Sequence, residues 1–493
     1  MNSRFLLLLS TIALFTALAL PVQLVAQERR PNHHQPHYKL VDLGTLGGPQ
    51  SAGFGIMLNN RGTVSGCADT STPDPNYPNF NPFLSPFGAD PFIFHTLSSQ
   101  GGALTDLGAL PGVNSSCVSF ITDEGLIAGA SENGLIDPLT GLPEVEGVAW
   151  SGGKIIDLKT FGGNGSFAIW ANNHGQVVGA AANTIPDPYS VFFGWGTQSR
   201  AFVWSESEGL RDLGTLGGPD ALATMINDRG QIFGASYTSD IPNPITQIPP
   251  YDAFFYEKGK MRDIPNAFGG TQTNPFFANN RGQLVGDASL PGEQFFHPFL
   301  WGKGVFTDLG TFGGDNGEAD WINDHGEVAG SADFPGDQIH HGAFWARNGA
   351  MTDVGTVDGD PCSRAFSLNK KDQVVGSSTD CSTYLHAFLW QNGQITDLNT
   401  FVPPGSGLQL TVALDINDGG EISGNATLAN GDQHAFLLIP CEGDDDGCRG
   451  VSPTGATPAH AALGDRPGGT LDRPRPRWGQ RHQLSGSATG RAN

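Results

Sequence analysis

Apolar residues occur along this chain in short bursts. Segments of five to seven residues, rich in Val, Ile, Phe and Trp, alternate with turns built from Gly, Asn and Asp. None of these segments is long enough for a helix, so the pattern predicts β-strands joined by tight turns. Four segments recur together as a unit of about 45 residues in the later part of the chain, which predicts a repeated four-stranded antiparallel sheet.

Three motifs mark each unit. The first is an Asp followed by Leu, Ile or Val, often continuing as Gly-Thr-Leu-Gly-Gly, at Asp42, Asp106, Asp157, Asp212, Asp263, Asp308, Asp353 and Asp397. The second is a turn that begins with Asn59, Asn172, Asn227, Asn279, Asn323, Asn369 or Asn417, and with Thr122 in the second unit. The third is the segment Ala-Phe-Leu-Trp, clearest at 387–390. Eight units follow.

The turns decide which strands share a sheet. Asn-Asp-Arg-Gly at 227–230 has Asn and Asp to open a turn and Gly where φ is positive, so it predicts a tight hairpin, and Asn-Gly at 392–393 predicts another. Each sheet therefore runs from the strand before the repeated Asn to the next Asp-Leu strand. The Gly-Thr-Leu-Gly-Gly loop then crosses from one sheet to the next.

Eight such sheets predict an all-β fold, an eight-bladed β-propeller of four-stranded antiparallel blades. The first Asp-Leu strand, about 38–43, has no earlier partner, and the last strand, about 434–439, has no later one. We predict that these two strands pair and close the ring, since closure removes an edge open to aggregation. The alternative is an open β-solenoid of stacked units.

The ends of the chain differ from the repeats. Arg4 precedes sixteen residues without a charge, a run shorter than the roughly 20 that span a membrane. The expected divisions are a secretory signal peptide at 1–26, a polar linker at 27–37, the repeat domain at 38–440, a disulfide-closed acidic loop at 441–448, and a disordered tail rich in Arg, Pro and Gly at 449–493. After signal cleavage we expect no membrane span and a secreted or periplasmic protein.

Export allows the six Cys to pair. Cys362 and Cys381 lie equally far from the centre of one hairpin and are predicted to face each other. Cys441 and Cys448 flank the acidic loop, and their bond would close it. Cys67 and Cys117 remain, in consecutive units, so their bond would cross between blades. Other pairings are compatible with the sequence, and this scheme is a hypothesis.

Charge and composition narrow the classes of function. The chain has 26 Lys and Arg against 49 Asp and Glu, a net charge of −23, which disfavours a nucleic-acid partner. It has neither a His-Glu-x-x-His nor a Gly-x-Ser-x-Gly motif. We therefore expect no cofactor and no metal site, and the sequence favours binding over catalysis.

The combination of Asp-Leu-Gly-Thr-Leu-Gly-Gly, Ile-Asn-x-x-Gly-x-Val-Val-Gly and His-Ala-Phe-Leu-Trp resembles the HAF-repeat family of probable extracellular proteins. The match extends from Tyr38 to about Pro440, with complete His-Ala-Phe at His386 and His434. The resemblance implies export and tandem repeats. It implies no assigned reaction.

Residues that recur in all units are interpreted as structural. The repeated Asp and Asn are expected to form hydrogen bonds in strands and turns, and His386 and His434 to pack or cap rather than to bind metal. The repeat is broken by Glu318, Asp320 and Arg364 in predicted innermost strands. These three are catalytic candidates for acid–base chemistry on a glycan, or else they form an ion pair between blades.

Long loops in the early units form a second departure from the repeat. They are rich in aromatic residues, namely Tyr77, Phe80, Phe83, Tyr189, Phe192, Phe193 and Trp195. In a meander these loops lie on the same face as the crossings between blades, opposite the Asn turns. Exposed rings there can stack on sugars or bury against a protein; alternatively, they fold back as a small core.

The leading hypothesis for function is an exported scaffold that binds an extracellular polysaccharide or another exported protein through the long-loop face. One alternative is a glycan-active hydrolase or lyase that uses the carboxylates near the channel. Another is a purely structural envelope protein.

Overall fold

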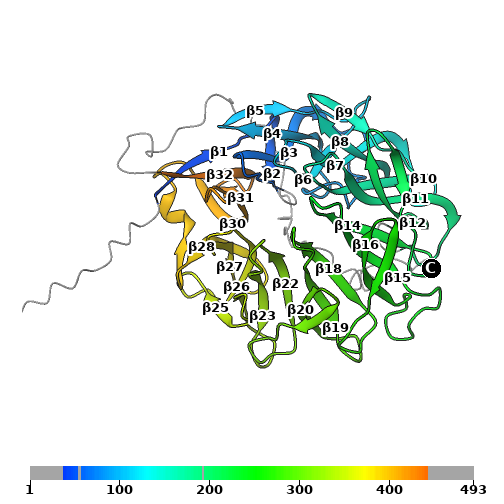
Figure 1. The fold of residues 1–493 in the computed structure, drawn as a ribbon. Helices are drawn as coiled ribbons and strands as arrows, with labels where there is room; N and C mark the ends of the chain where they lie inside the picture. Colours follow the sequence, from blue (N-terminus) through cyan, green and yellow to red (C-terminus); the bar gives the residue numbers. More distant parts are fainter. Residues whose placement is uncertain (1–36, 54–56, 191–193, 442–493) are drawn as a thin grey trace, which may run out of the picture. The chain divides into compact units, whose positions relative to one another are not determined.

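The computed structural model describes residues 37–53, 57–190 and 194–441. These residues form 32 β-strands and one short 3-10 helix, η1 (Leu398–Phe401), and the strands make eight sheets of four antiparallel strands each. The sheets follow one another around a ring as the blades of a β-propeller (Figure 1). The predicted all-β, eight-bladed fold is confirmed, and the solenoid alternative is wrong.

The blades are numbered here in chain order, each from its innermost strand outward. Blades 1 to 4 comprise β2 (Gly47–Ala52), β3 (Thr63–Pro73), β4 (Phe92–Gln100) and β5 (Ala103–Asp106); β6 (Ser116–Ile121), β7 (Ile127–Ile136), β8 (Pro143–Ser151) and β9 (Lys154–Asp157); β10 (Gly162–Ala171), β11 (Val177–Pro186), β12 (Thr197–Ser205) and β13 (Gly209–Asp212); and β14 (Ala221–Ile226), β15 (Ile232–Tyr237), β16 (Tyr251–Glu257) and β17 (Lys260–Ile264).

Blades 5 to 8 comprise β18 (Thr273–Ala278), β19 (Leu284–Ser289), β20 (Phe296–Gly302) and β21 (Val305–Asp308); β22 (Gly317–Ile322), β23 (Val328–Asp333), β24 (His340–Trp345) and β25 (Met351–Gly355); β26 (Cys362–Leu368), β27 (Val374–Thr379), β28 (Tyr384–Gln391) and β29 (Gln394–Asp397); and β30 (Leu408–Ile416), β31 (Ile422–Leu428) and β32 (Gln433–Cys441), completed by β1 (His37–Asp42).

Blade 8 closes the ring with strands from both ends of the repeat domain. The N-terminal β1 pairs antiparallel with the C-terminal β32, in a register that sets Tyr38 opposite Pro440 and Asp42 opposite Phe436 (Figure 1). His434 Nδ1 lies 2.9 Å from Asp42 Oδ1 across this pair. The predicted closure between the first and last strands is confirmed.

The repeated Asn forms a ring of hydrogen bonds at one end of the propeller. Its Nδ2 donates to the main-chain oxygen of the equivalent residue in the next blade, at 2.9–3.1 Å, from Asn59 to Thr122, Asn172 to Asn227, Asn227 to Asn279, Asn279 to Asn323, Asn323 to Asn369, Asn369 to Asn417 and Asn417 to Asn59. Thr122 has no amide, so the eighth link is missing. We call this end the Asn-turn end.

A second ring lies beside the first, one residue further along each turn. The main-chain N–H of one residue donates to the side chain of its equivalent in the next blade, from Asn60 to Asp123, Asn173 to Asp228, Asp228 to Asn280, Asn280 to Asp324, Lys370 to Asp418 and Asp418 to Asn60. Both rings tie neighbouring blades together where the inner strands end.

The glycine of the Val-Val-Gly motif lies where two strands approach closely. In blade 7, a Cβ on Gly376 would lie 1.9 Å from the main-chain oxygen of Arg364 and 2.7 Å from the ring of Phe388. Any larger residue would force these groups apart. Phe388, the Phe of the Ala-Phe motif, is fully buried. Its ring covers Gly376 and fills the space between blades.

A β-bulge interrupts the inner strand of blades 2 to 8 at equivalent positions, as between Ala319 and Trp321 in β22. Bulges re-aim side chains and increase twist. Hydrophobic clusters then form between successive blades, as where Phe388 of blade 7 packs with Phe344 of blade 6. The core is therefore divided among the interfaces of the ring.

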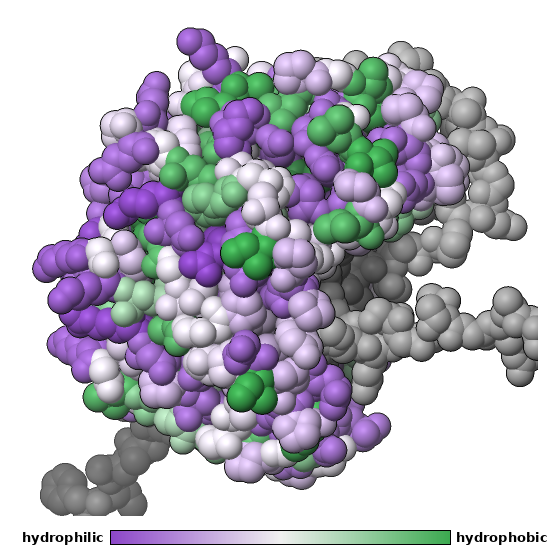
Figure 2. Space-filling model, turned by 90° about the vertical axis from the view of Figure 1, so that its right-hand side faces the viewer, coloured by the Kyte–Doolittle hydropathy of each residue, from purple (hydrophilic) through white to green (hydrophobic). Residues whose placement is uncertain are grey.

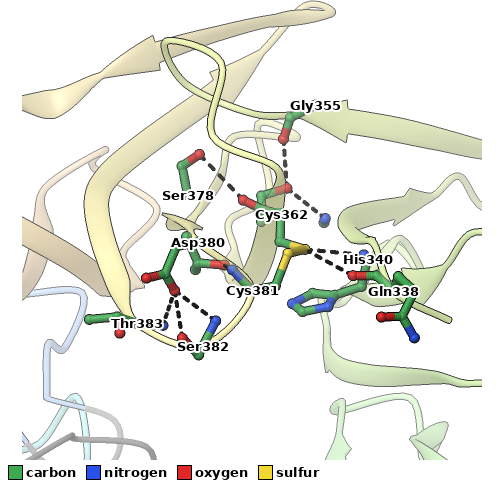
Figure 3. The surroundings of a disulfide bond; sticks show 12 residues. Gln338, His340, Gly355, Cys362, Ser378, Asp380, Cys381, Ser382 and Thr383 are labelled. Carbon is green, nitrogen blue, oxygen red and sulfur yellow. Dashed lines mark hydrogen bonds between the residues drawn. A yellow bond between two sulfur atoms is a disulfide. The ribbon is translucent and has the colours of Figure 1, made fainter.

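Two of the predicted disulfides are present. Cys67 and Cys117 join β3 to β6 across blades 1 and 2, and Cys362 and Cys381 join within blade 7 (Figure 3). The register behind the second prediction was wrong, since Cys362 lies opposite Thr379: Leu368 and Val374 already pair one residue away from the predicted register, and the bulge in β26 shifts it by one more. Cys381 lies beyond the end of β27, in a turn where Asp380 Oδ1 accepts hydrogen bonds from Ser382 and Thr383.

Several predictions concern residues outside the described ranges. These are the signal peptide, the linker up to residue 36, Cys448 and hence its pairing with Cys441, and the Arg-rich tail. Within the described ranges, no helix has the length and apolar character needed to cross a membrane.

Candidate functional site

Glu318, Asp320 and Arg364 lie together on neighbouring inner strands. Glu318 and Asp320 belong to β22 and are 6% and 5% exposed, and Arg364 belongs to β26. Arg364 Nη2 donates to Glu318 Oε1, and Ser331 Oγ donates to the same oxygen at 2.9 Å. Burial opposes the charge of Arg364, but the carboxylates of Glu318 and Asp320 outweigh it and raise its pKa. The trio is thus an ion pair between blades 6 and 7.

This geometry limits what the trio can do chemically. Glu318 Oε1 is already engaged by the Arg364 guanidinium and by the Ser331 hydroxyl. Replacing one member would also leave a buried charge unpaired, which is strongly destabilising. The trio therefore joins blades 6 and 7 structurally.

The repeated Asp of the Asp-Leu strand makes two sets of hydrogen bonds. One carboxylate oxygen accepts the N–H of the residue two positions on, as at Gly44, Gly108, Gly214, Gly310 and Gly355. A His or Arg side chain of the neighbouring strand contacts the same carboxylate in the pairs His95–Asp106, Arg200–Asp212, His297–Asp308, His341–Asp353 and His434–Asp42. These bonds give the Asp the structural role expected from the sequence.

His386 differs from this pattern. Its Nδ1 lies 2.8 Å from Asp360 Oδ2, in the segment before β26, rather than beside Asp397. Where the pairing is of the common kind, as in blade 5, the hydrogen bond to Asp308 raises the pKa of His297. Among the residues that the structure describes, no three His, Cys, Asp or Glu side chains are grouped so as to hold a metal ion.

The long loops of blades 1 to 4 share a motif of their own. Each contains an Asp or Asn followed by Pro, at Asp74, Asp137, Asp187 and Asn243, whose side-chain oxygen accepts the N–H two residues on at 2.7–2.9 Å. This side-chain turn gives each loop the same local fold. The loops and the crossings between blades lie at the end opposite the Asn turns, as the meander requires. We call this the long-loop face.

The aromatic residues predicted for this face have different positions. Tyr77 is 53% exposed, Phe80 and Tyr189 are half-buried, and Phe83 packs against the core of blades 1 to 4. Trp195 is only 6% exposed and belongs to that core, so the expectation that it presents a ring for ligand stacking is wrong. Its indole lies over Gly165, where a Cβ would come within 2.5 Å.

Phe192 and Phe193 lie outside the described residues. The half-buried Phe80 lines a small cavity of about 10 Å³ beside Glu132. Burial raises the pKa of Glu132 to about 7, opposed by its hydrogen bond from Ser115 and assisted by the charge of Asp74.

Aliphatic side chains are what this face exposes most. Among the described residues, ten large hydrophobic side chains are well exposed. Nine of them lie on the long-loop face: Tyr77, Val113, Leu135, Ile136, Leu139, Ile185, Ile241, Ile245 and Ile339. A side view of the molecule shows hydrophobic residues at the surface as separate green patches among hydrophilic ones (Figure 2). The tenth, Val305, is the first residue of β21 and lies at the opposite end.

Neighbouring loops contact one another or the next blade. Asn79 and Asn81 of the first loop donate to the main chain of the second at 2.9 and 3.0 Å, at Gly141 and Pro143. Tyr237 of blade 4 donates its hydroxyl to the main-chain oxygen of Tyr189 in the third loop at 2.9 Å. These contacts join the loops of blades 1 and 2, and they tie the loop of blade 3 to blade 4.

A buried pair of carboxyl groups anchors the third loop. Asp187 begins the loop, and Asp220 begins blade 4, where its Oδ1 accepts the N–H of Ser199 at 2.7 Å. Burial, followed by the neighbouring charge of Asp187, raises the pKa of Asp220 to about 9. Asp220 therefore holds a proton at neutral pH and can donate it to Asp187.

The sequence analysis looked for aromatic residues and missed the aliphatic ones. The signal was the repeated Asp-Pro or Asn-Pro, because Leu135, Ile185 and Ile241 stand two residues before it, and Leu139 and Ile245 two residues after it. A polar turn with apolar residues at fixed offsets presents those residues to solvent.

No protein-family model matches the chain, and no curated protein matches its sequence. Solved structures match in part. The β-propeller domain of the Trilobed protease from Pyrococcus furiosus is 12% identical, covering 70% of this chain and 96% of its own, with a TM-score of 0.42. TolB from Acinetobacter baumannii is 11% identical, covering 83% and 97%, with a TM-score of 0.31. Trypanosoma rangeli sialidase is 11% identical, covering 79% and 55%, with a TM-score of 0.32.

Proposed function

We propose that this protein is an exported interaction scaffold that binds another exported protein through its long-loop face. The observation that carries the proposal is the distribution of exposed large hydrophobic side chains, nine of ten of which lie on that face among the described residues. A concentration of exposed apolar side chains at one end of a domain indicates an interaction surface there. Four loops that share one motif but differ in their exposed residues are suited to recognition.

The chemistry of the exposed side chains favours a protein over a polysaccharide. Stacking on sugars requires exposed aromatic rings, and among the candidate aromatic residues that the structure describes only Tyr77 is well exposed. Leu139, Ile185 and Ile245 are aliphatic and gain by burial against an apolar partner surface. The two disulfides fit the oxidising compartment that export provides.

Photo-crosslinking in the source organism tests the proposal. A photoreactive amino acid is placed at Leu139, at Ile245 and, as a matched control, at Val305, which is 63% exposed at the opposite end. The crosslinked partner is identified, purified and titrated against the protein. Burial of each aliphatic side chain contributes about 1.5 kcal/mol or more, so L139S/I245S is expected to weaken binding at least about tenfold, and V305S to leave it unchanged.

Other outcomes would decide against the proposal. Equal crosslinking from Val305 would remove the preference for one face. Binding to a glycan array that is lost with Tyr77→Ala and kept in L139S/I245S would assign the face to a polysaccharide. If neither a specific protein partner nor a glycan binds, the result would favour the alternative of a purely structural envelope protein.

A further inference from the structure

The Asn-turn end holds a cavity of about 230 Å³, lined by residues of all eight blades at and next to the repeated turns. Pockets for drug-sized ligands usually measure about 300–1,000 Å³, so this one suits a small molecule or a single side chain. It lies opposite the long-loop face and plays no part in the function proposed above.

Aromatic rings form one wall of the cavity. Phe120, Trp170, Phe277 and Trp321 stand at the equivalent position of blades 2, 3, 5 and 6, two residues before each turn, and all are half-exposed. Phe120 stacks on Trp170 with centroids 3.9 Å apart, and Phe277 stacks on Trp321 at 3.7 Å. Trp170 meets Phe277 edge to face at 5.3 Å. The bulges of the inner strands place the four rings in one continuous arc.

The equivalent positions in blades 7 and 8 are polar. Ser367 Oγ donates to Asp415 Oδ1 at 3.0 Å, and the N–H of Leu58 donates to Asp415 Oδ2 at 3.3 Å. Asp415 is buried and belongs to the cavity lining. The cavity therefore has an aromatic wall on one part of its circumference and a carboxylate on another.

Acidic residues also surround the opening. Asp123, Asp228, Asp324 and Asp418 occupy alternate blades of the second ring, so with Asp415 the lining contains five carboxylates. Its one cation is Lys370, whose Nζ lies 2.8 Å from Asp418 Oδ2. One carboxylate is thus neutralised, and the others give the lining a negative charge.

In two of the turns, the residue after the second-ring position is an Arg whose side chain extends toward the next blade. Arg61 Nη2 lies 2.6 Å from Glu124 Oε1, and Arg281 Nη1 donates to the main-chain oxygen of His325 at 3.2 Å. Neither belongs to the cavity lining. They neutralise the outer surface and leave the inner opening acidic.

We propose that this cavity binds an organic cation, a guanidinium or alkylammonium group, with the cation against the aromatic arc and the carboxylates. Aromatic faces attract cations, and the attraction strengthens where water is excluded. The negative lining opposes anionic ligands. The same chemistry can come from a free small molecule or from an Arg or Lys side chain of a peptide, and the test separates the two sources.

Calorimetric titration tests the proposal with three probes: agmatine as a free cation, the blocked tripeptide acetyl-Gly-Arg-Gly-amide, and methyl glucoside as a neutral ring of similar size. The titrations are repeated on R473A/R475A/R477A, so that the chain's own Arg-rich segment cannot mask the site. Binding of agmatine supports a small-molecule ligand, and binding of the tripeptide alone supports a side-chain ligand. Binding of methyl glucoside alone, or of none of the probes in both proteins, overturns the proposal.

Variants identify the groups responsible. D123N/D228N removes two charges and introduces the residue that already stands at Asn173 and Asn280 of the same ring. We expect it to weaken cation binding about tenfold, or ~1.4 kcal/mol. The control D240N/D358N removes two exposed charges at the long-loop end and should leave affinity within about twofold. Equal effects of the two pairs would overturn the proposal.

The aromatic arc is tested by a matched pair at one position. Trp321→Phe keeps an aromatic face and is expected to retain cation binding, whereas Trp321→Leu keeps bulk without the π-system and should weaken it about fivefold. Equal affinity of the two variants would show that the ring only fills space, and would overturn the role of the arc.

Discussion

The two ends of this propeller are built by different means. At the Asn-turn end nearly every blade repeats the same residue, and seven of the eight possible Asn links between blades are made. At the long-loop end the loops differ in length and sequence, and contain buried carboxyl groups. Their contacts are specific to each blade, as in the hydroxyl bond from Tyr237 to Tyr189.

The difference shows how a repeat protein separates stability from variation. Short turns that bond to their neighbours hold the blades in order at one end, so loops at the other end can change without opening the ring. The disulfides supplement this arrangement at individual sites, between β3 and β6 and at the loop end of blade 7.

The largest effect is expected from removing the covalent link between blades 1 and 2. Cys67 and Cys117 are 50 residues apart, so C67A/C117A should lower the free energy of unfolding by about 4 kcal/mol. The bond between Cys362 and Cys381 closes a loop of only 19 residues, so C362A/C381A should lower it by about 3 kcal/mol. Denaturant titration measures both. Amide exchange should show the first loss of protection in blades 1 and 2, and uniform loss around the ring would contradict the local role.

The two ends can be compared directly with one residue type. Asn323 donates to Asn369 and accepts N–H groups from residues 325–327, whereas Asn243 accepts from Ile245 and donates to Thr271. Since buried groups left unsatisfied cost about 1–3 kcal/mol, Asn323→Ala should destabilise by about 3 kcal/mol and Asn243→Ala by about 1 kcal/mol. Equal costs in denaturant titrations would show that the Asn ring has no special weight.

The buried acids should make the long-loop end sensitive to alkaline pH. The folded-state pKa of Asp220 is raised to about 9, from an ordinary value of 3.8. The folded protein therefore holds a proton that the unfolded chain releases, and the associated stability is lost as pH rises from about 4 to about 9. Asp220→Asn, whose amide can still donate to Asp187, should be more stable than the parent at pH 9 by about 1 kcal/mol or more. Parallel stability curves between pH 5 and 9 would contradict this.

The smallest expected effect is a gain in stability. Thr122→Asn supplies the missing amide for a bond to the main-chain oxygen of Asn172, and its oxygen can still accept the N–H of Leu126, as the Thr122 hydroxyl does. Completing the Asn ring should stabilise the protein by about 1 kcal/mol. Asp or Ser at this position provides the control, since neither supplies the amide. An unchanged melting temperature would mean that seven links already hold the ring.

The architecture could be predicted from the sequence because residues close together in the chain determine the strands and turns of each repeat. Tight turns at Asn227 and Asn392 pair strands that are close in sequence, and the unpaired first and last strands leave one way to remove an open edge. The register error at Cys362 has the opposite cause. The hairpin turn and a bulge in β26 each shift the register by one residue, and counting residues to the centre of the hairpin reveals neither shift.

Site residues were predicted less well because burial depends on distant parts of the chain. The position of Trp195 in a long loop was compatible with an exposed ring or with a small core, and its ring packs into the core of blades 1 to 4. The aromatic arc was overlooked because Phe120, Trp170, Phe277 and Trp321 resemble ordinary strand residues when each unit is read alone. They become a shared feature only when the blades are arranged about one axis.

The strands, their order within each blade, the number of blades and the closing pair were already encoded in the order of residues along the chain, since turns and alternating strands depend on near neighbours. Assembly of the ring decided which rings and carboxylates face the axis, which loop residues are buried, and which aliphatic side chains meet water. Those outcomes depend on contacts between residues of neighbouring blades that are 44 to 63 positions apart in sequence, and in the closing blade on contacts across almost the whole domain.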